Sequence, residues 1–122
     1  AAQLWHTAGQ ANLLVYRVER LERGLRRVPA WVFASLGYAR PASARDFVAA
    51  LARSWSESGT IPHAVGLALG YPLKDVLGFT GLAPLACSGQ CGWRVYGDPG
   101  RSLARKRSFV AASRRAAEFI AA

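Results

Sequence analysis

The chain has 122 residues, enough for one domain, and at 52% hydrophobic residues it can bury a core, which excludes global disorder. No run approaches the ~18 apolar residues of a membrane span, and the first residues lack the basic and apolar parts of a signal peptide, so we expect a cytoplasmic protein. The net charge of +9 indicates a general attraction to polyanions and excludes no fold.

Residues 3–17 have the pattern of a β-hairpin with Gly9 at its turn. Its second arm, residues 12–17, is apolar on both faces, which predicts a central strand covered on both sides. Residues 18–27 then change to helical spacing, with Val18, Leu21 and Leu25 on one face. A second short helix is predicted from Pro29 to residue 36, with Trp31 among the residues that face inward.

A third helix is predicted over residues 44–56, with Ser43 as its N-cap. Pro62 opens a short helix to about residue 69, and Pro72 opens another to residue 78 or 79. Residues 80–91 have the composition of an irregular loop, and residues 92–96 alternate like a strand. Asp98 and the proline after it begin a long helix that ends near residue 120, with an apolar line of residues 103, 110 and 117.

These elements predict an α+β fold in a single domain, residues 1–122. We expect one small antiparallel sheet of about three strands, packed by five to six helices, with a long C-terminal helix.

Two stretches carry a family resemblance: IPHAVGLALGYPLKDVLGF at residues 61–79 and CGWRVYGD at residues 91–98. Together with LVYRVERL at residues 14–21 they make residues 12–98 similar to a bacterial family catalogued as a domain of unknown function, number 3793. The resemblance implies no activity, because the family has none assigned to it.

The chain departs from the family pattern in three places. The pattern has Glu after the histidine of the first stretch, and this chain has Ala64. Nothing here matches the His-Cys-x-Pro-Thr-Leu motif of the family's usual N-terminal segment, so the resemblance implies that this segment is missing. The C-terminal helix is richer in arginine than that of the family.

The stretch from residue 61 to residue 98 contains the candidate site. His63 at a helix start, Tyr71 between two helices and the strand from Cys91 are expected to meet in a pocket, where two helix N-termini and an arginine would attract an anion. We expect binding without catalysis, of a small anionic ligand, a metal-containing cofactor or a protein partner. No glycine-rich phosphate loop is present. The candidate ligand-binding residues are His63, Tyr71, Cys91, Arg94 and Tyr96. The alternative for the three aromatic residues Tyr71, Trp93 and Tyr96 is an ordinary place in the core.

The thiols leave other chemistry open. Cys91 with His63 would make a thiol-dependent redox protein or enzyme. Cys87 and Cys91 are spaced C-x3-C, which is not a zinc-knuckle or thioredoxin spacing, although with His63 they could supply three metal ligands. A reversible disulfide between the two cysteines, or two inert thiols, are the remaining possibilities.

The basic C-terminal helix suggests a third function, binding of RNA or DNA. Its basic residues spread over more than one helical face, which also suits a plain solvated surface. They are Arg101, Arg105, Lys106, Arg107, Arg114 and Arg115.

Overall fold

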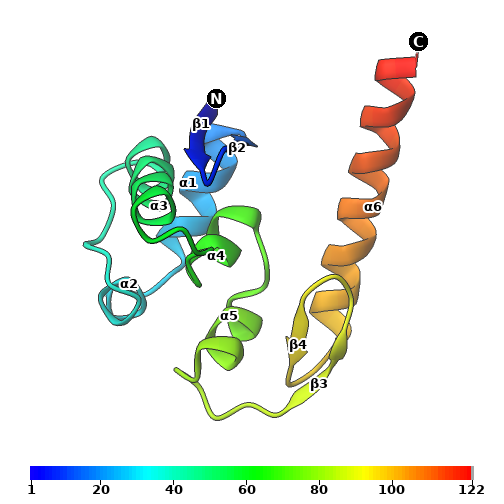
Figure 1. Ribbon diagram of the computed structural model, residues 1–122. Helices are drawn as coiled ribbons and strands as arrows, with labels where there is room; N and C mark the ends of the chain where they lie inside the picture. Colours follow the sequence, from blue (N-terminus) through cyan, green and yellow to red (C-terminus); the bar gives the residue numbers. More distant parts are fainter. Residues whose placement is uncertain (122) are drawn as a thin grey trace. The chain divides into compact units, whose positions relative to one another are not determined.

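The computed structural model describes residues 1–121 and divides into two compact units, Ala1–Gly70 and a second unit that begins at Tyr71 (Figure 1). The first unit contains a hairpin and helices α1 to α4, and the second contains α5, a second hairpin and α6. The predicted α+β class and long C-terminal helix are thereby confirmed for the described residues, and the six helices agree with the five to six predicted.

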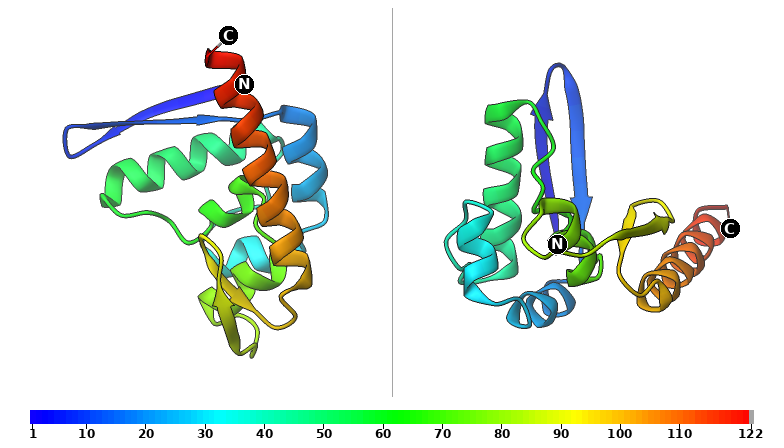
Figure 2. Two further views of the ribbon diagram at one scale, coloured as in Figure 1. Left: turned by 90° about the vertical axis from the view of Figure 1, so that its right-hand side faces the viewer. Right: turned by 90° about the horizontal axis from the view of Figure 1, so that it is seen from below.

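The first hairpin pairs β1 (Ala2–Thr7) with β2 (Gln10–Val15), and its two loop residues, Ala8 and Gly9, both have positive φ. Positive φ at both loop positions is the geometry of a type I′ turn, which suits the twist of a hairpin. One face of the hairpin lies along α3 (Figure 2). The ring centroids of Trp5 in the hairpin and Trp55 in α3 are 5.1 Å apart.

The other face of this hairpin is exposed. Leu13 is 64% exposed and Val15 is 71% exposed. The prediction of a central strand covered on both sides is therefore wrong, because a two-stranded sheet on a single helix has only one face to bury.

The helices of the first unit are α1 (Val18–Arg26), α2 (Ala30–Ser35), α3 (Ala44–Ser58) and α4 (Val65–Leu69). Ser43 is confirmed as the N-cap of α3, since its Oγ accepts a hydrogen bond of 3.1 Å from the Asp46 amide. Trp31, predicted to face inward, is exposed. The short α2 buries the adjacent pair Val32 and Phe33, and this pair leaves Trp31 on the solvent side.

An apolar core fills the first unit. At its centre the rings of Phe33 and Phe47 meet edge to face with centroids 5.7 Å apart, and Tyr38 packs on Phe47 at 5.8 Å. Aromatic pairs in this geometry contribute beyond their buried area. The buried apolar residues are Leu21, Leu25, Val28, Val32, Phe33, Ala44, Phe47, Val48, Leu51, Ala52, Ala64 and Leu67.

The second unit is built from α5 (Leu73–Thr80), β3 (Cys87–Gln90), β4 (Arg94–Tyr96) and α6 (Gly100–Ala121). β3 and β4 form an antiparallel hairpin of their own, so the prediction of one sheet of about three strands is wrong: the strands form two separate pairs. β3 falls within the predicted loop because Cys-Ser-Gly-Gln has little β-propensity, and pairing with β4 makes it a strand.

α6 begins one residue after the predicted proline, and Asp98 Oδ1 accepts a hydrogen bond of 3.0 Å from the Gly100 amide. Only its first half packs within the unit, through Ser102, Lys106 and Phe109. The predicted apolar line from Leu103 is exposed, because at about 100° per residue it lies roughly a quarter turn from the packed face. No helix among residues 1–121 is long and apolar enough to cross a membrane.

Candidate functional site

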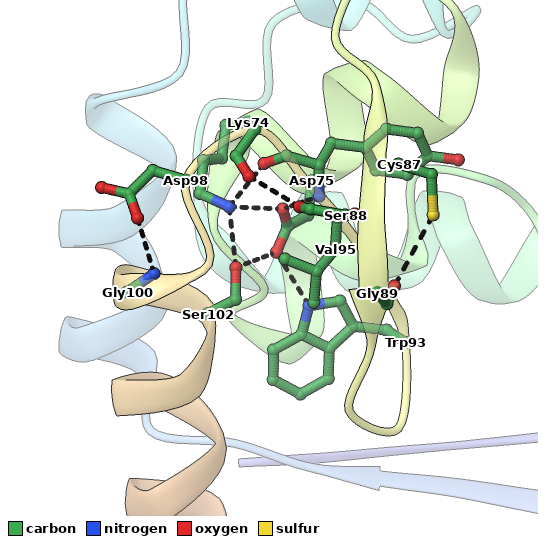
Figure 3. Close-up of polar contacts among 12 residues, drawn as sticks. Lys74, Asp75, Cys87, Ser88, Gly89, Trp93, Val95, Asp98, Gly100 and Ser102 are labelled. Carbon is green, nitrogen blue, oxygen red and sulfur yellow. Dashed lines mark hydrogen bonds and ion pairs between the residues drawn. The ribbon is translucent and has the colours of Figure 1, made fainter.

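Asp75, in the first turn of α5, is 2% exposed and accepts four hydrogen bonds (Figure 3). Oδ1 accepts from Lys74 Nζ at 2.7 Å and from the Tyr96 amide at 2.9 Å. Oδ2 accepts from Trp93 Nε1 at 2.9 Å and from Ser102 Oγ at 2.7 Å. One carboxylate therefore joins α5 to the second hairpin and to the start of α6. We call Lys74, Asp75, Trp93, Tyr96 and Ser102 the Asp75 network.

Lys74 closes this network from the other side. Its ammonium donates to Asp75, to the Tyr96 carbonyl at 2.7 Å and to Ser102 Oγ at 2.7 Å. An ammonium has three donors, and all three are used. Both charged groups are thus satisfied from within the unit. Because a satisfied buried network favours rigidity, we interpret this one as structural.

Burial is the largest single influence on the pKa of Asp75 and by itself would raise it. The hydrogen bonds from Lys74, Ser102, the Tyr96 backbone and Trp93 act in the opposite direction and together hold the pKa below the usual 3.8. Asp75 is therefore charged at neutral pH and pairs with Lys74. The ionised carboxylate of Asp75 can accept hydrogen bonds from all four donors, and this is its role in the network.

The rings of Tyr71, Trp93 and Phe109 form an aromatic trio beside the network. Tyr71 stacks on Trp93 with centroids 4.4 Å apart and planes 17° apart, and Phe109 of α6 lies 5.6 Å from Trp93. Burial, and secondly the nearby Cys91 thiol, raises the pKa of the Tyr71 phenol, so the phenol is neutral at physiological pH. Two of the predicted site residues therefore contact Trp93: Tyr71 through its ring, and Cys91 through a hydrogen bond of 3.0 Å from its amide to the Trp93 carbonyl.

Two further predicted site residues lie on β4. Tyr96 is buried against α5, where a Cβ atom added to Gly78 would lie 2.2 Å from the Tyr96 ring, so only glycine fits at that position. Arg94 is exposed, with its guanidinium carbon 5.9 Å from the centroid of the Phe79 ring. The contacts of Tyr96 are those of a core residue, and Arg94 lies on the surface.

Both cysteines are free thiols on the second hairpin, Cys87 in β3 and Cys91 in the loop that follows it. An extended strand rises about 3.3 Å per residue, which separates these two positions by more than the ~7 Å between Cα atoms that a disulfide spans. Within residues 1–121, no three side chains of His, Cys, Asp or Glu gather as a metal site.

His63 lies in a turn before α4 and not in the helix itself, because α4 begins at Val65. It belongs to the first unit, whereas Tyr71, Cys91, Arg94 and Tyr96 belong to the second. The shared pocket predicted from the sequence would join residues of both units, and it stays a prediction.

Sequence reasoning missed Lys74 and Ser102 and gave Asp75 no role. Lysine and serine are common surface residues, and nothing in their local pattern indicates that they meet. A signal was present at Asp75, a carboxylate in the first turn of a helix and followed directly by the apolar residues Val76 and Leu77. Three of its four partners, Trp93, Tyr96 and Ser102, could not be identified, because they lie 18 to 27 residues away along the chain.

Comparison with known proteins identifies a family and nothing more specific. The model of a family described as "Protein of unknown function (DUF3793)" matches residues 1–122, so the match extends beyond the resemblance seen over residues 12–98. No curated protein matches the chain. No solved structure matches it either.

Proposed function

Because the chain belongs to the DUF3793 family, which has no assigned activity, we propose a function from its own geometry: α6 binds the phosphate backbone of nucleic acid. The observation that carries the proposal is the concentration of exposed arginine on this helix. The proposal includes a cytoplasmic location, where such a partner is abundant.

The positive charge of the second unit lies on α6. Between residues 71 and 99 the basic residues Lys74 and Arg94 are balanced by Asp75 and Asp98. α6 itself carries six basic residues and one acidic residue, Glu118. The helix therefore presents a surplus of positive charge that the rest of its unit does not neutralise, which favours a polyanionic partner.

The arginines lie on the side of α6 that does not pack within the unit. At about 100° per residue they fall within roughly half of the helix circumference. Arg107, Arg114 and Arg115 lie opposite Ser102 and Phe109, and Arg101 and Arg105 lie at one edge of this half, with Arg105 about 40° from Phe109. All five are exposed, whereas Lys106 is half-buried and lies close to Gly92. We call this set the Arg face of α6; its members are Arg101, Arg105, Arg107, Arg114 and Arg115.

The length and chemistry of the Arg face suit a nucleic-acid backbone. A helix rises about 1.5 Å per residue, so the Arg face extends over roughly 20 Å. Over that length a DNA duplex presents many phosphates, at about one charge per 1.7 Å of its axis. Guanidinium groups bind phosphate oxygens in pairs of parallel hydrogen bonds, which lysine does not do.

The predicted small-ligand site has less support than the Arg face. The Asp75 network is satisfied internally, Tyr96 is packed against Gly78, and Tyr71 is stacked on Trp93. These internal contacts explain the positions of Asp75, Tyr96 and Tyr71, and no bound ligand is needed to explain them. The thiol alternative based on Cys91 and His63 stays a prediction.

The experiment measures binding of a labelled single-stranded RNA and a labelled DNA duplex by fluorescence anisotropy, from about 50 mM to about 200 mM salt. The test variant replaces Arg105, Arg107, Arg114 and Arg115 with Gln. We expect the slope of log affinity against log salt to fall by about 3, since each lost phosphate contact removes about 0.7 to 0.9. The better-bound probe identifies the class of nucleic acid.

The control variant replaces four exposed arginines of the first unit with Gln, namely Arg20, Arg23, Arg27 and Arg53. It has the same net charge as the test variant. Equal losses of affinity in both variants would mean diffuse attraction and would refute a role for α6. A third arm uses vesicles of anionic lipid: if only vesicle binding depends on the Arg face, the partner is a membrane surface and the proposal is wrong.

A further inference from the structure

A hollow of about 160 Å³ lies in the first unit between α1, α2 and the segment that leads into α3. Its charged lining residues are Glu22, Arg26 and Arg40. Ser43 also lines it, and its apolar floor is formed by the buried side chains of Leu25 and Phe33. None of these residues belongs to the predicted site or to the Arg face of α6.

We infer that this hollow binds a small anion through Arg26 and Arg40, with a phosphate or a carboxylate as the group recognised. Two guanidinium groups against a single carboxylate leave the lining with net positive charge. Arginine stays charged at any physiological pH. The inference is independent of nucleic-acid binding by α6, since it concerns a different unit.

Arg40 is held in position before any ligand arrives. It donates a hydrogen bond of 3.1 Å from a terminal guanidinium nitrogen to the Val28 carbonyl, and its guanidinium carbon lies 5.9 Å from the centroid of the Phe33 ring. One N–H is used in this bond, and a guanidinium has five. A positioned guanidinium loses less freedom on binding, which favours affinity for an anion.

Glu22 has a structural contact that accounts for its presence among these arginines. Its Oε1 accepts a hydrogen bond of 3.3 Å from the Ala44 amide, the first residue of α3. The carboxylate therefore stabilises the helix start, where negative charge is favoured. Its charge nevertheless opposes an anionic ligand in the same hollow, so neutralising it should strengthen anion binding.

The size of the hollow limits the ligand. At roughly 30 Å³ per molecule in the liquid, the volume corresponds to about five waters. This space accepts inorganic phosphate or a short organic acid, and the body of a larger ligand would extend out of the hollow. The apolar floor at Leu25 and Phe33 suits a small hydrocarbon body attached to the acidic group.

The test is a titration of the full chain with inorganic phosphate, followed by NMR of the backbone amides, with chloride at equal ionic strength as the reference. We expect shifts centred on residues 22–26 and 40–44 that saturate with phosphate and not with chloride. Arg26→Gln and Arg40→Gln should each weaken binding about tenfold, as expected for loss of a charge-assisted hydrogen bond.

Two control variants match these substitutions. Arg27→Gln and Arg45→Gln remove neighbouring exposed charges that do not line the hollow, and they should leave the affinity within about twofold. Glu22→Gln should tighten phosphate binding severalfold, and the amide spectrum reports in the same experiment whether α3 remains intact. Equal losses in all four arginine variants, or weaker binding after Glu22→Gln in a folded protein, would overturn the inference.

A parallel titration with acetate distinguishes the source of the acidic group. Saturable shifts at the same residues with phosphate alone assign the hollow to phosphate-bearing ligands. Shifts with acetate alone assign it to carboxylates, and shifts with both anions show that it accepts either group. Each of these results supports the inference. Saturation with neither anion refutes it.

Discussion

The two units of the chain are stabilised in different ways. The first unit buries twelve apolar side chains around Phe33 and Phe47, and the second buries four, Val76, Trp93, Val95 and Tyr96. Among the described residues, the two buried polar side chains, Asp75 and Ser102, both belong to the second unit. The smaller apolar core is therefore accompanied by a hydrogen-bonded ion pair.

This difference shows that a unit with a small apolar core uses directional hydrogen bonds to orient a long helix. Apolar contacts are non-directional and tolerate several arrangements of similar volume. The hydrogen bond from Ser102 to Asp75 is directional, and it sets which residue of α6 faces α5. In the second unit the network thus determines the orientation of α6, and with it the direction of the Arg face.

The largest effect is expected from Phe47→Ala in the apolar core. The ring is 1% exposed, and truncation of a buried phenylalanine costs about 3 to 5 kcal/mol of the free energy of unfolding. Hydrogen exchange measured peptide by peptide should show lost protection in residues 1–70. Phe119→Ala, at a ring that is 84% exposed, is the control and should change stability by less than about 0.5 kcal/mol.

This experiment also tests the prediction of a single domain over residues 1–122. Loss of protection confined to the first unit would show that the two units unfold independently. Equal loss in both units would show one cooperative domain and would contradict the distinction between the units.

The next largest effect is expected from Asp75→Asn, at about 3 kcal/mol near pH 7, because the substitution removes one partner of a buried pair and turns an amide toward existing donors. The pKa of Asp75 is lowered in the folded state, so its contribution is complete above the unfolded value and declines as the pH falls below about 4. Urea unfolding at a series of pH values should show the difference from wild type shrinking in acid.

Asp98→Asn provides the matched control for this substitution. Asp98 is exposed and accepts from the Gly100 amide at the start of α6. Asparagine serves that position as well as aspartate does, so the expected cost is near zero. A constant difference between wild type and Asp75→Asn from pH 7 to acid would contradict the charged role of Asp75.

The smallest effects come from a pair of glycine substitutions with opposite signs. Gly78→Ala places a Cβ atom 2.2 Å from the Tyr96 ring and should lower stability by about 1 to 3 kcal/mol. Gly24→Ala, in α1 with no atom within 4 Å of the added Cβ, should raise stability by about 0.5 to 1 kcal/mol. Thermal unfolding of both variants measures the pair, and destabilisation by Gly24→Ala would show that the added methyl group is not accommodated.

Predictions from local patterns were the most accurate. The turn at Gly9, the cap at Ser43 and the helix start at Asp98 depend on a few neighbouring residues, and the structure places each within a residue or two of its predicted position. The predicted burial of Trp31 was wrong, because the direction in which a six-residue helix faces depends on what it packs against.

In the candidate site, too, the features that depend on contacts between distant residues were not predicted. The pocket predicted around Tyr71 and Cys91 stays a prediction, and the Asp75 network was not predicted. A contact between Asp75 and Ser102 depends on how far α5, the second hairpin and α6 turn relative to one another, and no local pattern encodes that turn.

The sequence by itself therefore determined the helices and the first hairpin of this protein, its excess of arginine and its family, but not strand β3. Helical spacing, capping residues and charge are properties of short segments, and they act before the chain is packed. Only the tertiary structure decided which strands pair and which aromatic rings are buried. It also decided which side of α6 packs within its unit, and therefore that the arginines are exposed. These features depend on contacts between residues distant in the chain, such as those that place Asp75 beside Trp93 and Ser102.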